Sequence, residues 1–347
     1  MKLHDLLTHP IIQGPMAGGA STPALIAAVS NAGGLGSLPI SLLSPDLICE
    51  QVAQIRALTA RPFQLNLFVQ QTPHPSAQDI AEAAELLRPV WSRLGWSHLP
   101  IPSKWCEEFE AQFDVIVAER PAVASFTFDI LSAGQVRRLH QAGVFVMGTV
   151  TTVPEALAWQ AIGADAIIAS GLEAGGHRGT FLAPQTEATA GAFDLLPAVV
   201  AAVDIPVICA GGIMDGAGIL RALELGAAAV QMGTAFLVTD ESGIHPAYKQ
   251  RLLSPGDHRT RLTRAISGRY ARGIENDLIR TLLPVEARLP PYPVLNALTT
   301  PIRAAAARDG DTELMSLWCG TGVNLARGMP AARLVATLVA EMRAGRQ

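Results

Sequence analysis

Short apolar runs alternate with longer amphipathic stretches along most of the chain. Several amphipathic stretches end in a glycine just before the next apolar run, namely Gly33, Gly143, Gly163 and Gly226. Glycine suits the C-terminus of a helix because it adopts positive φ without steric cost. A parallel strand can then begin within a few residues, since αβ loops are short. The pattern therefore predicts a repeated strand–helix unit.

The apolar runs are short and rich in β-branched or small residues, which is typical of buried parallel strands. They span residues 11–17, 35–38, 63–69, 122–128, 144–150, 166–170, 206–210 and 228–232. Eight successive β/α units predict an α/β fold of the (β/α)8 TIM-barrel type. A doubly wound sheet would more often contain fewer strands.

Two stretches interrupt this alternation of strands and helices, residues 71–121 and residues 241–324. The first contains apparent helices over 77–94 and 104–118. The second is rich in proline, arginine and turn signals. A barrel needs only roughly 250 residues, so the chain has room for such excursions.

The strand–helix pattern resumes with a closing helix over residues 330–342, which begins with a proline in its first turn. We expect one barrel with an inserted helical or mixed cap subdomain over its C-terminal face. The barrel would comprise residues 1–70, 122–240 and 325–347, and the cap 71–121 and 241–324. Enzymes use such caps to exclude water and to shape a substrate pocket.

Composition and charge narrow the possible functions. Of the 347 residues, 49% are hydrophobic and the formal net charge is −4, with no basic stripe that would favour nucleic-acid binding. The four cysteines are scattered, and no histidine pair has metal-ligand spacing, so neither disulfides nor a metal site is predicted. The N-terminus has no apolar signal core, and no run reaches the ~20 apolar residues of a membrane span. We expect a cytoplasmic monomer or homodimer that acts on a small molecule.

Glycine-rich loops follow the seventh and eighth predicted strands, CAGGIMDG at 209–216 and QMGTAF at 231–236. In barrels of this kind these two loops commonly bind phosphate through backbone N–H groups and a helix N-terminus. A Cβ atom would block the approach of the phosphate oxygens. A phosphate site is therefore predicted at Gly211, Gly212, Gln231, Met232, Gly233 and Thr234.

The loop after the sixth strand, ASGLEAGGHRGTF at 169–181, places His177 among glycines on the predicted catalytic face. Histidine titrates near neutral pH, so this side chain is a candidate proton acceptor or donor, or a hydrogen-bond donor to a developing anion. Arg178 is expected to pair with an anion or, more simply, to face a carboxylate or solvent. Glu173 is expected to structure the loop.

Two more strand ends carry candidate ligand contacts. Asn66 in NLF, at the end of the third strand, needs a hydrogen-bonding partner, which a flavin or a loop backbone would provide. The segment QGPMAGG at 13–19, around Met16, has small residues that let a flat ligand approach the backbone. A tight turn into a helix is the simpler interpretation of that segment.

Taken together, these motifs resemble those of the nitronate monooxygenases, formerly called 2-nitropropane dioxygenases. QGPMAGG, NLF, GLEAGGHRGTF, AGGI and QMGT occur in the family's order and spacing, and the resemblance runs from about Ile11 to the C-terminal helix. It includes SGRYARGIEN at 267–276 and YPVLN at 292–296, both in the predicted cap. The EAGGHRG run is specific to this family and its near relatives.

The resemblance implies an FMN-dependent enzyme that oxidises alkyl nitronates with O₂ to carbonyl compounds and nitrite. His177 matches the family's catalytic histidine, and Tyr292 matches a tyrosine beside the substrate pocket. The implied FMN contacts are Met16, Asn66, Ser170, Gly175, Gly176, Gly211, Gly212, Gln231, Met232, Gly233 and Thr234.

Three positions depart from the family pattern. Ser170 stands where a flavin-contacting glutamine is usual, Asp129 where glycine is common, and Thr321 where glutamine is often found. The first change removes a long hydrogen-bonding side chain near the flavin. The second adds a carboxylate close to the expected site. These differences leave FMN binding expected but bear on the identity of the substrate.

Other functions fit part of the same pattern. The main alternative is an NAD(P)H-dependent FMN reductase of quinones or enoyl thioesters on the same scaffold. A flavin-free, phosphate-binding isomerase or lyase would explain the loops after the seventh and eighth strands but not Asn66 and His177. A non-catalytic flavin-binding protein is a further alternative.

Overall fold

Eight parallel strands form a closed barrel that the helices surround. The computed structural model describes residues 2–256 and 258–345. Its larger sheet has the strand order β1-β9-β8-β6-β5-β4-β3-β2, and a parallel bridge between Ile12 and Leu35 joins the two end strands. The strands are β1 (Ile11–Gln13), β2 (Gly36–Pro39), β3 (Phe63–Phe68), β4 (Val123–Thr127), β5 (Phe145–Val150), β6 (Ala166–Ser170), β8 (Val207–Ala210) and β9 (Ala229–Met232). The predicted (β/α)8 barrel is confirmed.

All eight predicted strands are present, but the first is shorter than expected. It was predicted over 11–17 and ends at Gln13. Beyond this point Gly18 and Gly19 have φ values of 76° and 91°, which an extended strand does not contain. Residues 14–19 are therefore a loop at the mouth of the barrel.

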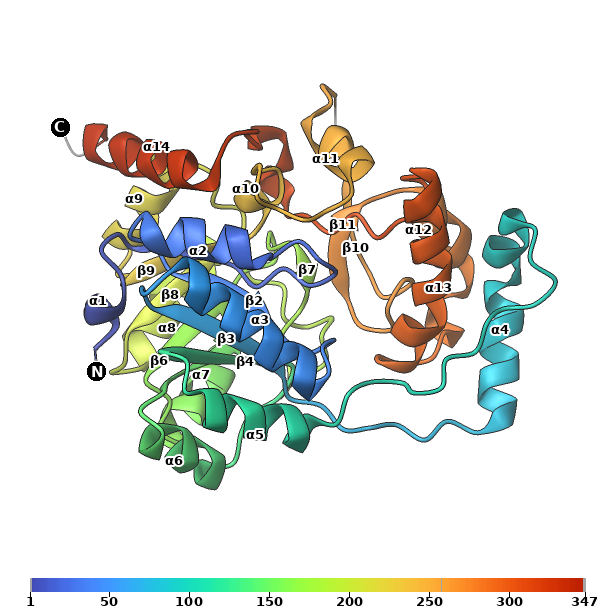
Figure 1. Cartoon of the computed structure of the whole chain (residues 1–347), viewed down its shortest axis with the longest axis horizontal. Coiled ribbons are helices and arrows are strands. Elements are labelled where there is room, and N and C mark those ends of the chain that lie inside the picture. The colour runs from blue at the N-terminus through green and yellow to red at the C-terminus, as the bar shows by residue number, and fades with distance from the viewer. Residues whose placement is uncertain (1, 257, 346–347) are drawn as a thin grey trace.

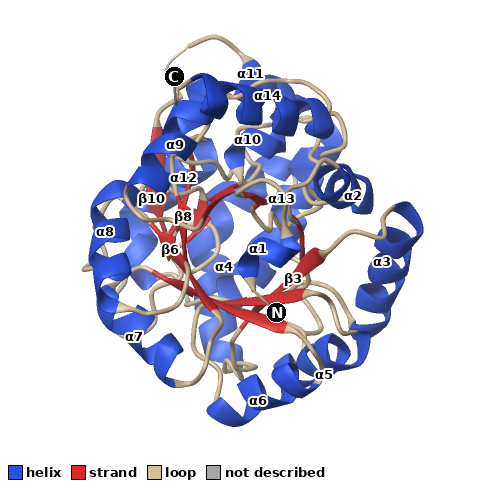
Figure 2. Ribbon diagram, turned by 90° about the vertical axis from the view of Figure 1, so that its left-hand side faces the viewer, coloured by secondary structure: helices blue, strands red, loops and turns tan. Residues whose placement is uncertain are grey.

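A ring of helices surrounds the strands (Figure 2). It consists of α2 (Pro23–Asn31), α3 (Pro45–Leu58), α5 (Phe109–Glu119), α6 (Ala133–Gln141), α7 (Val153–Ala161), α8 (Ala192–Ala202), α9 (Gly216–Glu224) and α14 (Ala331–Ala344). The last helix, α14, packs against α9 and α2 and so completes the ring. This is the closing helix predicted from the sequence. In the described part of the chain, no helix has both the length and the apolar character needed to span a membrane.

Local sequence explains why these helices form and how they face the barrel. In α3, the Ser44 hydroxyl accepts a hydrogen bond from the Leu47 amide, and Pro45 occupies the first helical turn. Both features favour a helix start. The buried residues Ile48, Val52 and Ile55 follow at helical spacing, so one face of the helix packs on the strands.

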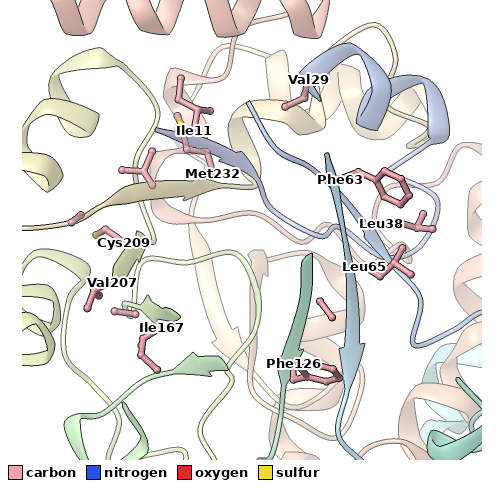
Figure 3. Packing of buried hydrophobic residues seen from close by; sticks show 14 of the residues in the cluster. Ile11, Val29, Leu38, Phe63, Leu65, Phe126, Ile167, Val207, Cys209 and Met232 are labelled. Atoms are coloured by element: carbon pink, nitrogen blue, oxygen red, sulfur yellow. The ribbon is translucent and has the colours of Figure 1, made fainter. Parts of the chain in front are cut away.

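The core has two layers because successive residues of a strand point to opposite faces. Ile11 and Ile167 belong to the cluster between strands and helices, which Figure 3 shows with Phe63 and Val207. Their neighbours Ile12 and Ile168 belong to a separate cluster, together with Leu3 and Leu6 of α1 (Leu3–Leu6). The barrel interior is thus packed with side chains, and α1 lies at its N-terminal end.

Two excursions from the ring form a separate apolar cluster. One contains α4 (Ala77–Trp91) and the 3-10 helix Ser92–Leu94. The other contains α11 (Pro246–Leu253), β10 (Thr260–Thr263), β11 (Ala271–Ile274), α12 (Asp277–Leu282), α13 (Val294–Asp309) and the 3-10 helices Leu283–Arg288 and Thr321–Leu325. Helix α4 packs against α12 and α13, on the side of the molecule opposite both termini (Figure 1).

One helix that was expected among the cap segments lies elsewhere. The sequence predicted a helix over 104–118 within the excursion 71–121. In the structure α5 begins at Phe109 and packs against α3, α6 and β3. It therefore belongs to the ring, because it fills the position of the helix between the third and fourth strands. Only the residues before it extend away from the barrel.

A small antiparallel sheet connects the second excursion to the barrel. Strand β11 pairs with β10 on one side and with β7 (Gly176–His177) on the other. Strand β7 lies in the loop after β6, so the histidine loop is held by a strand that comes roughly ninety residues later in the chain (His177 opposite Ala271).

Candidate active site

A cavity of about 460 Å³ lies at the C-terminal ends of the barrel strands. Its wall includes residues from the strand-end loops and from α13 and the 314–320 region. Every residue that the sequence singled out as catalytic, cofactor-binding or substrate-binding lines it: Met16, Asn66, Ser170, Gly175, Gly176, His177, Gly211, Gly212, Gln231, Met232, Gly233, Thr234 and Tyr292. The fold thus brings together residues that are up to 276 positions apart in sequence (16 to 292).

The loops after β8 and β9 form an open backbone surface in this cavity. Gly211 and Gly212 have φ values of 121° and 71°. Within the described residues, the N–H groups of Gly212 and Gly233 have no acceptor. A Cβ atom on Gly233 would have only the Met16 side chain within 4 Å, so it would project into the cavity. Free amides beside an unfilled space fit a phosphate group.

Polar side chains at neighbouring strand ends fit a flavin ring. Asn66 is 2% exposed, and its amide nitrogen donates to the Ser125 hydroxyl at 2.9 Å and to the Thr127 hydroxyl at 3.3 Å. The side-chain oxygen Oδ1 of Asn66 has no donor among the described residues and can therefore accept a ligand N–H. The Gln231 Oε1 atom is buried and has no donor among the described residues. A buried unpaired oxygen is costly unless a ligand satisfies it.

Hydrogen bonds determine the tautomer of His177. Its Nε2 atom lies 2.8 Å from the Ser267 hydroxyl oxygen, and that oxygen lies 3.1 Å from the Arg269 carbonyl. Ser267 has a single hydroxyl hydrogen, which the carbonyl must accept because it cannot donate. His177 Nε2 therefore carries the proton and donates to Ser267. Its Nδ1 atom is the acceptor, with no donor to it among the described residues.

Aromatic rings surround His177 on several sides. The ring centroids of Phe128, Tyr292 and Trp318 lie 5.5 Å from that of His177, and that of Phe68 lies 6.2 Å away. These rings come from two barrel strand ends and two cap segments. They leave His177 only partly exposed, at a position where it lines the cavity.

The surroundings of His177 favour its neutral form. Burial, followed by the positive charges of Arg269 and Arg303, lowers the pKa of His177 from 6.5 to about 3. The position of His177 in a glycine-rich loop did not indicate this low pKa, because the two arginines that contribute to it come from segments far away in the sequence. Neutral imidazole retains a lone pair on Nδ1 and a donor on Nε2.

Arg178 has a structural role that neither interpretation of the sequence anticipated. It is 1% exposed, and its guanidinium donates to the carbonyl oxygens of Ser170, Gly171 and Ala188. It therefore holds the loop after β6 by backbone contacts and faces neither a carboxylate nor solvent. Glu173 accepts a hydrogen bond from the Ala192 amide at 2.8 Å, at the start of α8, as expected of a residue that structures the loop.

The three departures from the family pattern lie in different surroundings. Ser170 lines the cavity. Asp129 is exposed and does not line it, although its charge opposes the burial that lowers the pKa of Arg269 to about 10. Thr321 is also exposed, and its amide donates to the Glu173 carbonyl at 3.0 Å. The carboxylate of Asp129 therefore acts on the site through Arg269 and not directly.

Several residues of the site were not singled out from the sequence. Phe68 and Phe128 lie at the ends of the third and fourth predicted strands, and Phe68 belongs to the NLF motif, so their position at strand ends was a usable signal. Ser267 lies in SGRYARGIEN, which was noted as a motif without a role for the serine. Trp318 and Arg303 line the cavity from the second excursion, and no local pattern distinguishes them from other cap residues.

No group of three or more His, Cys, Asp or Glu side chains within residues 2–256 and 258–345 is arranged to hold a metal ion. The donors and acceptors of the cavity instead fit a phosphorylated flavin, with the phosphate at the loops after β8 and β9. Acceptor atoms at Asn66 and Gln231 are available to the ring.

Comparison with known proteins gives consistent matches over the whole chain. A family model described as nitronate monooxygenase matches residues 1–341. A probable nitronate monooxygenase of Staphylococcus aureus (strain MSSA476) is 38% identical over 334 residues, which cover 96% of this chain and 94% of the relative. Among solved structures, nitroalkane oxidase from Streptomyces ansochromogenes is 42% identical, with a TM-score of 0.92 and coverage of 99% and 98% of the two chains. FabK from Thermotoga maritima is 29% identical, with a TM-score of 0.77 and coverage of 99% and 96%.

Proposed function

The chain belongs to the nitronate monooxygenase family, and from this premise we propose that it is an FMN-dependent oxidoreductase that oxidises alkyl nitronates with O₂ to carbonyl compounds and nitrite. The observation that carries this proposal is the composition of the cavity. It combines open glycine loops after β8 and β9 with a shielded, neutral His177 and Tyr292. Neutral nitroalkanes are a second class of substrate to test, because the similar Streptomyces protein is named a nitroalkane oxidase.

In this proposal the residues that hold FMN are those of the phosphate loops and of the neighbouring strand ends. The amides of Gly212 and Gly233 would bind phosphate, while Asn66 and Gln231 would hydrogen-bond the ring. FMN, when bound, supplies the electron transfer between substrate and O₂. The protein positions the substrate, accepts or donates protons, and excludes water.

His177 would act as the proton acceptor, through Nδ1. A neutral nitroalkane would lose its α-proton to this nitrogen, whereas a nitronate needs no such transfer. An anion bound beside the imidazole would raise the pKa of His177, because a nearby negative charge favours the imidazolium form. Ser267 would keep Nδ1 as the acceptor by taking the Nε2 hydrogen bond.

The test begins with the visible spectrum of the purified protein, which should show bound flavin. Ethylnitronate in air should then give O₂ consumption and nitrite, while NADH or NADPH added without O₂ should leave the flavin absorbance unchanged. Loss of that absorbance with either nicotinamide, together with no nitrite from ethylnitronate, would replace the proposal with the reductase alternative. A protein that remains colourless after incubation with FMN would contradict the cofactor.

A further inference from the structure

Arg303 is a guanidinium in the cavity wall with no carboxylate partner. It lies on α13, and its side chain contributes to the cavity surface near Tyr292. Among the described residues no acidic oxygen lies within 4 Å of it, whereas Arg93 and Arg280 of the cap region pair with Asp277. A mostly buried cation without a counterion is unfavourable unless something else compensates for it.

The hydrogen bonds of Arg303 do little to connect α13 to other parts of the structure. Its Nη2 atom donates at 2.9 Å to the carbonyl oxygen and Oδ1 of Asn296 and to the Thr300 hydroxyl. Both partners belong to α13 itself, so these bonds orient the guanidinium without connecting elements. The one contact outside the helix is to the Ser316 hydroxyl at 3.4 Å. The buried Nε atom has no acceptor among the described residues.

The charge of Arg303 reaches the reacting part of the cavity. Burial lowers the pKa of Arg303 to about 10, so it remains a cation at neutral pH. Arg303 and His177 line the same cavity, and the charge of Arg303 helps to lower the pKa of His177. Among the described residues, its hydrogen-bond partners Asn296, Thr300 and Ser316 are all uncharged. Arg303 therefore places an unpaired positive charge on the cap side of the cavity, although the whole chain carries a formal charge of −4.

We propose that Arg303, oriented by Asn296 and Thr300, binds an anionic oxygen of the substrate and thereby determines the preference of the site for anionic over neutral substrates. This inference rests on the proposed function. Guanidinium is well suited to the role because it presents several donors in one plane to an anionic oxygen pair. That oxygen belongs either to the nitronate group or to a carboxylate elsewhere on the substrate.

The test compares three variants of the flavin-loaded enzyme. Arg303→Met removes the charge but keeps the length of the side chain, and Arg303→Lys keeps the charge. Arg308→Met removes an exposed arginine from the same helix and serves as the matched control. The substrates are the nitronate of 1-nitrobutane, the nitronate of 4-nitrobutanoate, and neutral 1-nitrobutane at a pH where it stays protonated. Flavin content and melting temperature verify that each variant is folded.

For Arg303→Met we expect kcat/KM for both nitronates to fall at least about thirtyfold, mainly through KM, and that for neutral 1-nitrobutane to change less than about threefold. Arg303→Lys should recover part of the loss, and Arg308→Met should lie within about twofold of the wild type. A loss confined to the nitrobutanoate compound would assign Arg303 to a distant carboxylate. Equal losses on charged and neutral substrates, or values no different from those of Arg308→Met, would overturn the inference.

A binding measurement separates this inference from the proposed function. Calorimetry on the flavin-loaded enzyme would compare butanoate with the uncharged butanamide. We expect butanoate to bind more tightly, and Arg303→Met to weaken butanoate binding at least about tenfold without affecting butanamide. Wild-type enzyme that oxidises no nitronate but shows this pattern would refute only the proposed function. Absence of butanoate binding, or binding unchanged by Arg303→Met, in an enzyme without nitronate activity would overturn the inference as well.

Discussion

Ser267 determines which nitrogen of His177 carries a proton, because its own hydroxyl hydrogen is donated to the Arg269 carbonyl. The consequence is a neutral imidazole with its lone pair on Nδ1. The neighbouring charges of Arg269 and Arg303 reinforce the neutral state. The protonation of this residue is thus a property of contacts made by the cap.

His177→Ala should separate the two classes of substrate. We expect the variant to retain FMN, because the predicted cofactor contacts lie on other residues. Its turnover of neutral nitroethane should fall roughly 10²-fold or more, since general base catalysis contributes on this scale. Turnover of ethylnitronate should fall much less, because no proton has to be removed. Steady-state kinetics with both substrates would measure the difference.

Equal, small losses with both substrates would refute the role of His177 as a base. Ser267→Ala provides the accompanying control for tautomer positioning. It should keep FMN and leave nitronate turnover nearly unchanged, while it lowers nitroethane turnover by roughly tenfold and alters its pH profile. An unchanged pH profile would show that Ser267 does not orient the imidazole.

The lowered pKa of His177 also predicts a dependence of stability on pH. Above pH 6.5 neither the folded nor the unfolded chain protonates His177, so it contributes nothing to this dependence. Between pH 6.5 and about 3 the unfolded chain binds this proton and the folded chain does not, so stability falls as pH falls. Compared with His177→Gln, wild-type protein should lose roughly 1–2 kcal/mol between pH 6.5 and 4.5, after allowance for partial exposure.

Urea unfolding of both proteins at a series of pH values, with the cofactor state kept the same, would measure this difference. The two stability curves should run in parallel above pH 7 and diverge below 6.5. Curves that remain parallel down to pH 4.5 would show that His177 is protonated in the folded chain.

At the scale of elements, the loop after β6 is held by a buried carboxylate. Glu155 is fully buried at the start of α7. One of its oxygens accepts from the Thr151 amide and hydroxyl and the Thr152 amide, and the other from the amides of Phe181 at 2.6 Å and Leu182 at 3.2 Å. The same side chain thus caps a helix and fixes the far end of the loop that carries His177.

Glu155→Ala should lower the free energy of unfolding by roughly 3–5 kcal/mol, because it leaves several buried donors without an acceptor. Denaturant unfolding would measure this loss, with Glu224→Ala, an exposed acidic residue of α9, as the control within about 0.5 kcal/mol of the wild type. A loss below about 1 kcal/mol would show that water replaces the carboxylate and that the loop does not depend on it.

Gly175 is required because a segment of the cap packs against it, which its motif in the sequence does not indicate. The resemblance of the sequence implied only that Gly175 contacts FMN. In the structure, a Cβ atom on Gly175 would lie 2.5 Å from the Cys319 carbonyl carbon and the Gly320 nitrogen. Part of the glycine content of the loop therefore allows the cap backbone to approach. The cap and the loop are packed as one unit.

At the scale of the whole molecule, the cavity unites barrel and cap, so its ligand should stabilise both. We expect removal of FMN to lower the melting temperature and restoration of FMN to recover it. At an FMN concentration of 100 Kd the stabilisation is about 2.7 kcal/mol, because the ligand binds only the folded chain. Thermal unfolding at several FMN concentrations would measure this effect. A melting temperature independent of FMN would contradict the cofactor site.

The barrel was predictable because its signals are local. Each strand is a short apolar run, and several helices have a start signal and a buried face, as in α3 with Ser44 and Ile48. Where the prediction was wrong, the local signal was ambiguous. The first strand was extended through small residues that form a loop, and the fifth helix was begun too early among residues without helical periodicity.

The strand order, the glycine loops and the barrel half of the cavity could be predicted from the amino-acid sequence, because residues at successive strand ends converge whenever parallel strands close into a barrel. The cap residues that meet them could be identified only in the folded chain. Trp318 lies beside His177 and Arg303 lines the same cavity because segments far apart in the chain pack together, and no local periodicity encodes such contacts. The pKa of His177 was likewise decided by folding, since burial and the charges of distant arginines act through space and not along the sequence.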